Sequence, residues 1–168
     1  SIENIVDKIE RNYAALHQEG FKTGNGLQFL SHLLTFNPEP PEVKAHWAKH
    51  CYDYLREHKL KVTPMYYGTI GFLAMLGEQC HKALGDVVEG MKYLKSAKIM
   101  RGGSKELNLM LVSALVNDLY LRGAQNQRRI TETGLSTSIQ AVIAAQPAAL
   151  IAASSAAAAA AASSSSSS

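Results

Sequence analysis

Apolar residues in this chain recur at the spacing of amphipathic helices. Val6, Ile9 and Tyr13 lie three and four residues apart, which places them on one face of an α-helix. Glycine and proline clusters, such as residues 24–26 and 37–41, separate this segment from later segments with the same spacing. The pattern predicts six helices, over residues 2–20, 26–36, 42–59, 64–76, 80–99 and 105–121.

Residues at the predicted boundaries agree with these limits. Thr63 and Pro64 suit an N-cap and a first-turn proline, and Ser104 suits the cap of the last helix. That last helix is apolar nearly all round but too short to span a bilayer. We therefore expect it to be buried between neighbouring helices.

The helices repeat in pairs with a period of 39 residues. Leu16, Leu55 and Leu94 are spaced by this step without any gap. The same step relates Val6, Ala45 and Leu84; Ile9, Ala48 and Val87; Tyr13, Tyr52 and Met91; Phe21, Leu60 and Ile99; Leu33, Phe72 and Leu111; and Leu34, Leu73 and Val112. One helix pair cannot bury its own apolar face, but stacked pairs can. We therefore predict an all-α fold, an α-solenoid of about three helix–turn–helix hairpins.

The repeat register limits the predicted domain. It fails after Leu121, so we assign residues 1–121 to the helical-repeat domain. Residues 122–151 form a predicted polar loop and a possible extra helix over 139–151, interrupted by Pro147. Residues 152–168 contain only alanine and serine and are treated as a low-complexity or placeholder tail. The first helix is the second of a hairpin, so we expect a fragment, or a partner covering that end.

Composition narrows the possible partners. Seventeen Lys and Arg against fourteen Asp and Glu make the chain mildly basic, which permits RNA binding without requiring it. Cys51 and Cys80 form no CxxC motif, in keeping with a reducing compartment. No apolar run is long enough for a membrane span.

Two segments carry a family resemblance. Residues 48–60 have a small residue, an aromatic residue four positions later and a leucine three further on, and residues 13–21 end in the same way with Gly20 present. Tyr67-Gly68-Thr69-Ile70 is similar to the start of a first helix. This pattern resembles the pentatricopeptide repeat (PPR), although the period is longer and Gly68 replaces an asparagine. Tetratricopeptide (TPR) repeats fit worse because their tryptophan and Leu-Gly signature is missing.

The PPR resemblance implies a right-handed superhelix that binds single-stranded RNA, one base per repeat. The family's selector position falls on Leu30, Thr69 and Asn108, and a hydroxyl or amide there pairs with a base edge. Thr69 and Asn108 are therefore candidate RNA-binding residues, whereas Leu30 cannot pair. The junction partner falls near Pro64 and Gly103, where the family has a polar residue. The alternative is that Thr69 and Asn108 are ordinary polar helix residues.

A basic run supplies further candidates for RNA binding. Its members are Lys92, Lys95, Lys98, Arg101 and Lys105. As a ridge across stacked repeats they would contact phosphates. As cations near helix ends they would instead complement the helix dipole and keep a face solvated.

Catalytic and metal sites are not predicted. His46 and His50 lie one helical turn apart near Cys51 and Asp53, but zinc needs a second cluster of ligands, and the sequence has none. No phosphate-binding loop, GxSxG, HExxH or paired-carboxylate motif occurs. We therefore expect no enzyme activity, no metal and no cofactor.

Two functions remain as expectations. The resemblance implies an organellar, mitochondrial protein that binds RNA or belongs to a large ribonucleoprotein such as the ribosome, together with other protein subunits. The alternative is a protein–protein scaffold subunit without nucleic-acid contact. The face formed by the first helices discriminates between them, because RNA requires a basic, polar face and a partner helix requires an apolar one.

Overall fold

The computed structural model describes residues 2–99 and 104–126. This part of the chain contains six α-helices and no strand, so the prediction of an all-α fold with six helices is confirmed. The helices are α1 (Ile2–Gln18), α2 (Asn25–Leu33), α3 (Pro41–Glu57), α4 (Gly68–Ala74), α5 (Cys80–Ser96) and α6 (Lys105–Asn126). Three short 3-10 helices adjoin them: η1 (Leu34–Phe36), η2 (Pro64–Tyr66) and η3 (Gly77–Gln79). The predicted extra helix over 139–151 and the Ala/Ser tail lie outside the described residues.

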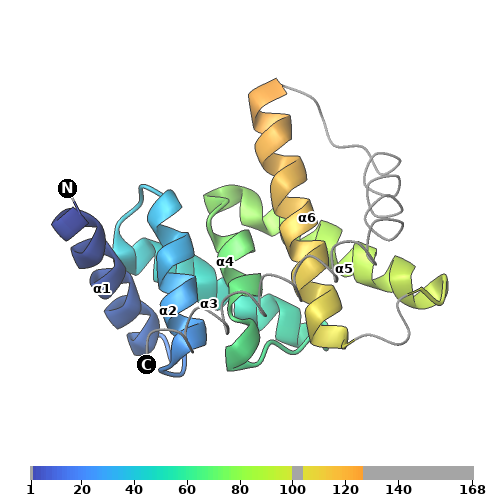
Figure 1. The fold of residues 1–168 in the computed structure, drawn as a ribbon. Coiled ribbons are helices and arrows are strands. Elements are labelled where there is room, and N and C mark those ends of the chain that lie inside the picture. Colours follow the sequence, from blue (N-terminus) through green and yellow to red (C-terminus); the bar gives the residue numbers. More distant parts are fainter. Residues whose placement is uncertain (1, 100–103, 127–168) are drawn as a thin grey trace, which may run out of the picture.

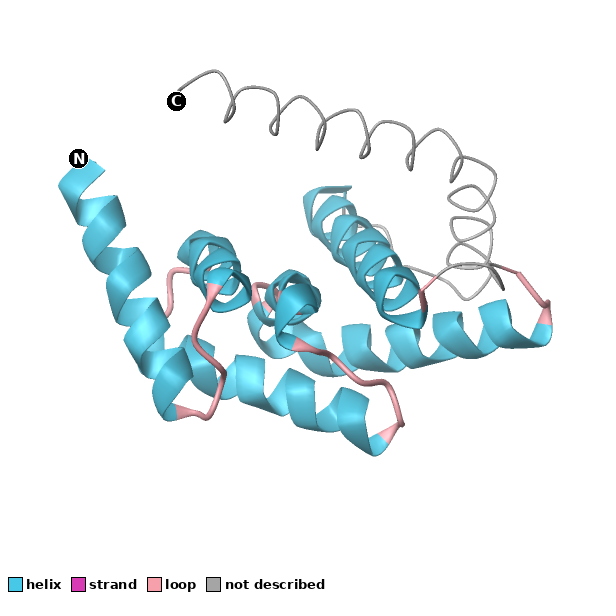
Figure 2. Ribbon diagram, turned by 60° about the horizontal axis from the view of Figure 1, so that its bottom comes forward, coloured by secondary structure: helices cyan, strands magenta, loops and turns pink. Residues whose placement is uncertain are grey.

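The helices form two layers. α1, α3 and α5 make one layer, and α2, α4 and α6 lie side by side in the other (Figures 1 and 2). Each helix of the second layer packs against helices of the first, as α4 does against α3 and α6 does against α5. This arrangement is that of successive helical hairpins.

The period of 39 residues reappears in the backbone at the ends of α1, α3 and α5. Gly20, Lys59 and Lys98 follow these helices with φ of 101°, 60° and 58°. In each case the next residue's N–H returns to a carbonyl five residues earlier, a helix-ending pattern that requires the left-handed conformation. These bonds join Phe21 to Leu16 at 3.2 Å, Leu60 to Leu55 at 2.8 Å and Ile99 to Leu94 at 3.0 Å. The repeat is therefore a repeat of helix endings as well as of apolar positions.

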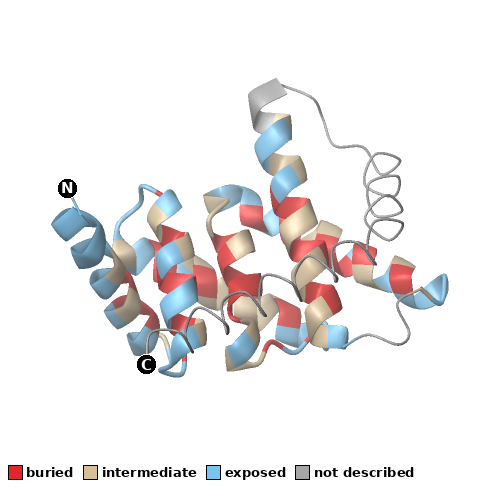
Figure 3. Ribbon diagram, viewed as in Figure 1, coloured by how far each residue is buried: buried red, intermediate tan, exposed pale blue. Residues whose placement is uncertain are grey.

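The core lies between the two layers (Figure 3). Leu16 and Leu55 are fully buried, and Leu94 is 4% exposed. Full burial of a leucine stabilises the fold by about 1.5–3 kcal/mol. These equivalent leucines are therefore major contributors to the packing between successive helices of the two layers. Two polar side chains of the core are tied to the backbone, since Asn12 Nδ2 donates to the Ser31 carbonyl at 3.1 Å and Ser31 Oγ donates to the Leu27 carbonyl at 2.7 Å.

Lys44 is an exception to the rule that lysines lie at the surface. Its side chain is buried, and its Nζ donates to the carbonyls of Leu34 at 3.1 Å and Asn37 at 3.3 Å. Burial, with a smaller contribution from Lys8, lowers the pKa of Lys44. The ammonium group thus satisfies a carbonyl just after the end of α2 and another just after η1, where a helix favours a cation.

Gly26 marks the closest approach between α2 and η2. A Cβ at this position would lie 1.8 Å from the carbonyl oxygen of Pro64, which is backbone and cannot swing away. We expect Gly26→Ala to destabilise the protein by about 3 kcal/mol, because the two segments must separate. Urea unfolding measures the change.

Gly85→Ala in α5 is the matched control, since nothing lies within 4 Å of its added methyl group. Alanine stabilises a helix interior by about 0.5–1 kcal/mol relative to glycine. Equal stability of the two variants would contradict the close packing of Gly26.

Candidate functional site

Charged residues are absent from two equivalent segments of the second layer. Residues 23–38, which include α2 and η1, contain no Asp, Glu, Lys or Arg, and neither do residues 62–77, which include η2 and α4. These two segments are equivalent under the 39-residue step. In contrast, α1, α3 and α5 carry surface ion pairs such as Lys49–Asp53. We call the layer of α1, α3 and α5 the charged layer. In the other layer α2, η1, η2 and α4 present an uncharged surface, whereas α6 carries the Arg122–Asp118 ion pair.

The uncharged surface exposes large apolar side chains. Phe29 is 49% exposed, Phe36 is 74% exposed and Met65 is 81% exposed. Phe72 and Met75 are half-buried on α4 and at its end. We call these five residues the uncharged face. An exposed group of aromatic and methionine side chains is a common feature of protein-binding surfaces.

Close packing of α2 on α4 fixes this face. A Cβ at Gly68 would lie 2.6 Å from Cε1 of Phe29, so the aromatic ring rests directly on the glycine. α6 is tied to α4 in turn, because Asn117 Nδ2 donates to the Phe72 carbonyl at 2.6 Å. The half-exposed ring of Phe29 is therefore held in place before any partner arrives, which limits the entropy cost of binding.

The two predicted base-pairing residues do not lie on a surface. Thr69 is fully buried and Asn108 is 7% exposed. Both residues occupy the same position of the 39-residue repeat as Leu30, which is also fully buried. All three residues belong to the packing between helices. The repeat period aligned them correctly, but apolar periodicity did not indicate which side of the helix they occupy.

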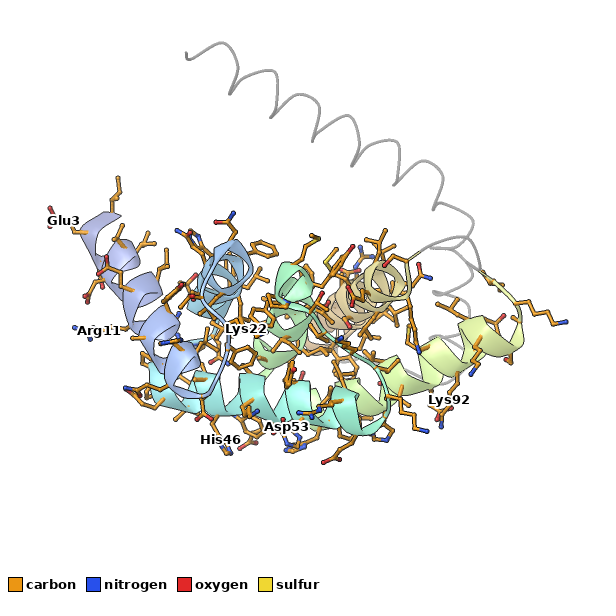
Figure 4. The ribbon with its side chains drawn as sticks, turned by 90° about the horizontal axis from the view of Figure 1, so that it is seen from below. Glu3, Arg11, Lys22, His46, Asp53 and Lys92 are labelled. Carbon is orange, nitrogen blue, oxygen red and sulfur yellow. The ribbon has the colours of Figure 1, made fainter. Side chains whose placement is uncertain are left out.

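The predicted basic run lies elsewhere. Lys92, Lys95 and Lys98 are exposed on or directly after α5, and Lys105 is exposed in the first turn of α6. Lys92 lies 3.6 Å from Glu89 on its own helix, and Figure 4 shows it on α5. Arg101 lies outside the described residues. Lys92, Lys95 and Lys98 therefore belong to the charged layer and the turn after it, whereas Lys105 opens α6 in the other layer, where the next residue, Glu106, accepts a hydrogen bond from Thr63.

Histidines from two helices meet on the charged layer. The rings of His50 and His81 lie 4.5 Å apart, and Trp47 packs edge-on against His81 at 5.2 Å. Burial lowers the pKa of His50, and the neighbouring His81 and His46 lower it further, against the opposing effect of Asp53 and Glu57. No group of three metal-binding side chains occurs in the described residues. The sequence indicated His46 and His50, but His81 comes from the next repeat and was missed.

The lowered pKa of His50 makes stability depend on pH. In the folded state His50 resists protonation, whereas in the unfolded state it takes up a proton near pH 6.5. The contribution of neutral His50 to the free energy of unfolding is therefore present above about pH 6.5 and is lost as the pH falls below that value. We expect His50→Gln to flatten this part of the stability curve, measured by urea unfolding across a pH series.

His32→Gln, at an exposed histidine of α2, is the control for that series. An unchanged pH slope in His50→Gln would show that the close histidine pair does not resist protonation.

Comparisons with known proteins decide the family. Residues 1–148 match the family described as "Protein of unknown function (DUF4003)". The chain belongs to this family. It is also 30% identical over 145 residues to "Uncharacterized protein YeaA" from Bacillus subtilis (strain 168). The alignment covers 86% of this chain and 42% of that relative, so the chain spans less than half of the relative's length. No solved structure matches.

This membership corrects the PPR assignment and what followed from it. The family matched over most of the chain is DUF4003, and the relative is bacterial, so the predicted mitochondrial location and organellar RNA role are wrong. The prediction of no membrane span stands for the described residues, where no helix is long and apolar enough to cross a bilayer. The resemblance failed because a small residue, an aromatic residue and a leucine at helical spacing suit any stacked pair of helices.

Proposed function

We propose that this domain is a non-catalytic binding domain that holds an amphipathic helix of another protein on its uncharged face. The observation that carries this proposal is the exposure of Phe29, Phe36 and Met65 on two segments, 23–38 and 62–77, that are free of Asp, Glu, Lys and Arg. A helix with an apolar stripe and a polar back would cover these side chains and leave its polar side in water.

The chemistry of the face favours an apolar partner. Without a lysine or arginine, α2, η1, η2 and α4 provide no cation to neutralise phosphates, and phosphate contacts dominate nucleic-acid affinity. Methionine side chains such as Met65 and Met75 are flexible and polarisable and adapt to apolar helices. Phe29, whose ring rests on Gly68, supplies a fixed aromatic side chain, as an anchor residue does at an interface.

The same face also supports a non-enzymatic role. Its exposed side chains are phenylalanine and methionine, which provide no acid, base or nucleophile. We further infer that the two layers are a short α-solenoid, since the helix endings at Gly20, Lys59 and Lys98 repeat at one step. Solenoids commonly bind extended or helical segments along one layer.

The test is photo-crosslinking in bacterial cells, with a photoreactive phenylalanine analogue in place of Phe29. We expect a protein crosslink that mass spectrometry places on an amphipathic helix. A synthetic peptide of that helix should bind the purified protein, and Phe29→Ser should weaken binding by at least about tenfold, because the anchor side chain is lost.

Position 10, an exposed residue of α1 in the charged layer, gives the matched control for the analogue, and Glu10→Gln is the control substitution for peptide binding. Neither should reproduce the Phe29 result. A crosslink to nucleic acid, a crosslinked segment without an apolar stripe, or equal binding by Phe29→Ser would overturn the proposal.

A further inference from the structure

A small cleft lies between the end of α1 and α3. Its volume is about 210 Å³, below the roughly 300 Å³ at which pockets begin to hold drug-sized ligands. Three cations line it: Lys22 from the loop after α1, and Lys49 and Arg56 from α3. Figure 4 labels Lys22 on that loop. Glu19 is the acidic residue in the lining, so the described lining is predominantly cationic.

Aromatic packing fixes the loop that carries Lys22. Tyr67 is 4% exposed, and its hydroxyl oxygen accepts a hydrogen bond from the Lys22 backbone N–H at 3.0 Å. This bond uses a lone pair of the hydroxyl and leaves its O–H to donate to another acceptor. Phe21 packs edge-on against both Tyr67, at 5.1 Å, and Tyr52, at 5.8 Å. The cations and a hydroxyl donor are thus held beside one another by a rigid aromatic cluster.

The fold does not require this set of residues. The first junction, between α1 and α3, has helix endings at Gly20 and Lys59. The second junction, between α3 and α5, repeats this geometry 39 residues later with helix endings at Lys59 and Lys98. There the positions of Lys49, Tyr52 and Tyr67 are taken by Val88, Met91 and Glu106, respectively. Glu106 instead accepts a hydrogen bond from Thr63 at 2.9 Å. The second junction keeps cations at the positions of Lys22 and Arg56, as Lys61 and Lys95, but forms without the third cation and without the two tyrosines. Lys49, Tyr52 and Tyr67 therefore distinguish the first junction, where they complete a cleft that stable packing does not require.

We propose that this cleft binds the phosphoryl group of a small phosphate monoester. Asp53 pairs with Lys49 at 3.1 Å and moderates its charge, while Lys22 and Arg56 are exposed at the rim and form no ion pair with a carboxylate of the described residues. A guanidinium matches two phosphoryl oxygens at once, and lysines add point charges. Tyr52 provides an aromatic wall for the organic group of the ester. The cleft shares no residue with the uncharged face, so this inference is independent of the proposed partner.

The experiment is a calorimetric titration of the full chain at low salt with three probes: inorganic phosphate, phenyl phosphate and dimethyl phosphate. We expect saturable binding of the first two at millimolar concentration, tighter for phenyl phosphate because of its ring. Dimethyl phosphate, a monoanionic diester, should bind at least about tenfold more weakly because it lacks the second charge.

Substitutions locate the site. Lys22→Gln and Arg56→Gln should each weaken phenyl phosphate binding by about tenfold, while both proteins keep the unfolding temperature of the parent because the side chains are exposed. Lys95→Gln, the equivalent of Arg56 at the next junction, should bind like the parent. No saturable binding, equal loss in Lys95→Gln, or diester binding as tight as that of the monoesters would overturn the inference.

Discussion

Burial of apolar side chains between two layers of helices is the interaction on which the rest of this structure depends. Successive hairpins pack on one another, as α3 does on α1 and α5 does on α3. The left-handed endings at Gly20, Lys59 and Lys98 turn the chain back at equivalent points, so that Leu16 and its equivalents enter the core in register. Tight contacts such as Gly26 against Pro64 then set the distance between α2 and η2.

The same constraint separates the chemistry of the two layers. α1, α3 and α5 are long enough to carry charges on their outer sides, whereas α2 and α4 are short and free of charged residues. Phe29 and Met65 consequently project from a surface without electrostatic selectivity, and the cations Lys22 and Arg56 gather beside α3. An apolar partner and a small anion would therefore bind on different residues and need not compete.

Much of the fold was predictable from the sequence, because helical periodicity and breakers are local signals. All six helices were found near their predicted limits, and the 39-residue step reappears in the backbone. The candidate site was harder to predict from the sequence. Thr69 and Asn108 share a register with Leu30, and only the packed structure shows that this column is buried. The contact of His50 with His81 and the burial of Lys44 depend on side chains that meet across helices, which a linear pattern does not encode. The family assignment failed for a related reason, since residues that satisfy helix packing are shared by unrelated repeats.

The central claim is that the uncharged face is the surface that binds a partner helix. Hydrogen–deuterium exchange of the protein, alone and saturated with the bound helix, tests it most directly. The account predicts slower exchange in α2, η1, η2 and α4, with α3 and α5 unchanged, because covered amides at the binding surface open less often. Slower exchange confined to α3 and α5 would place the partner on the charged layer and contradict the account.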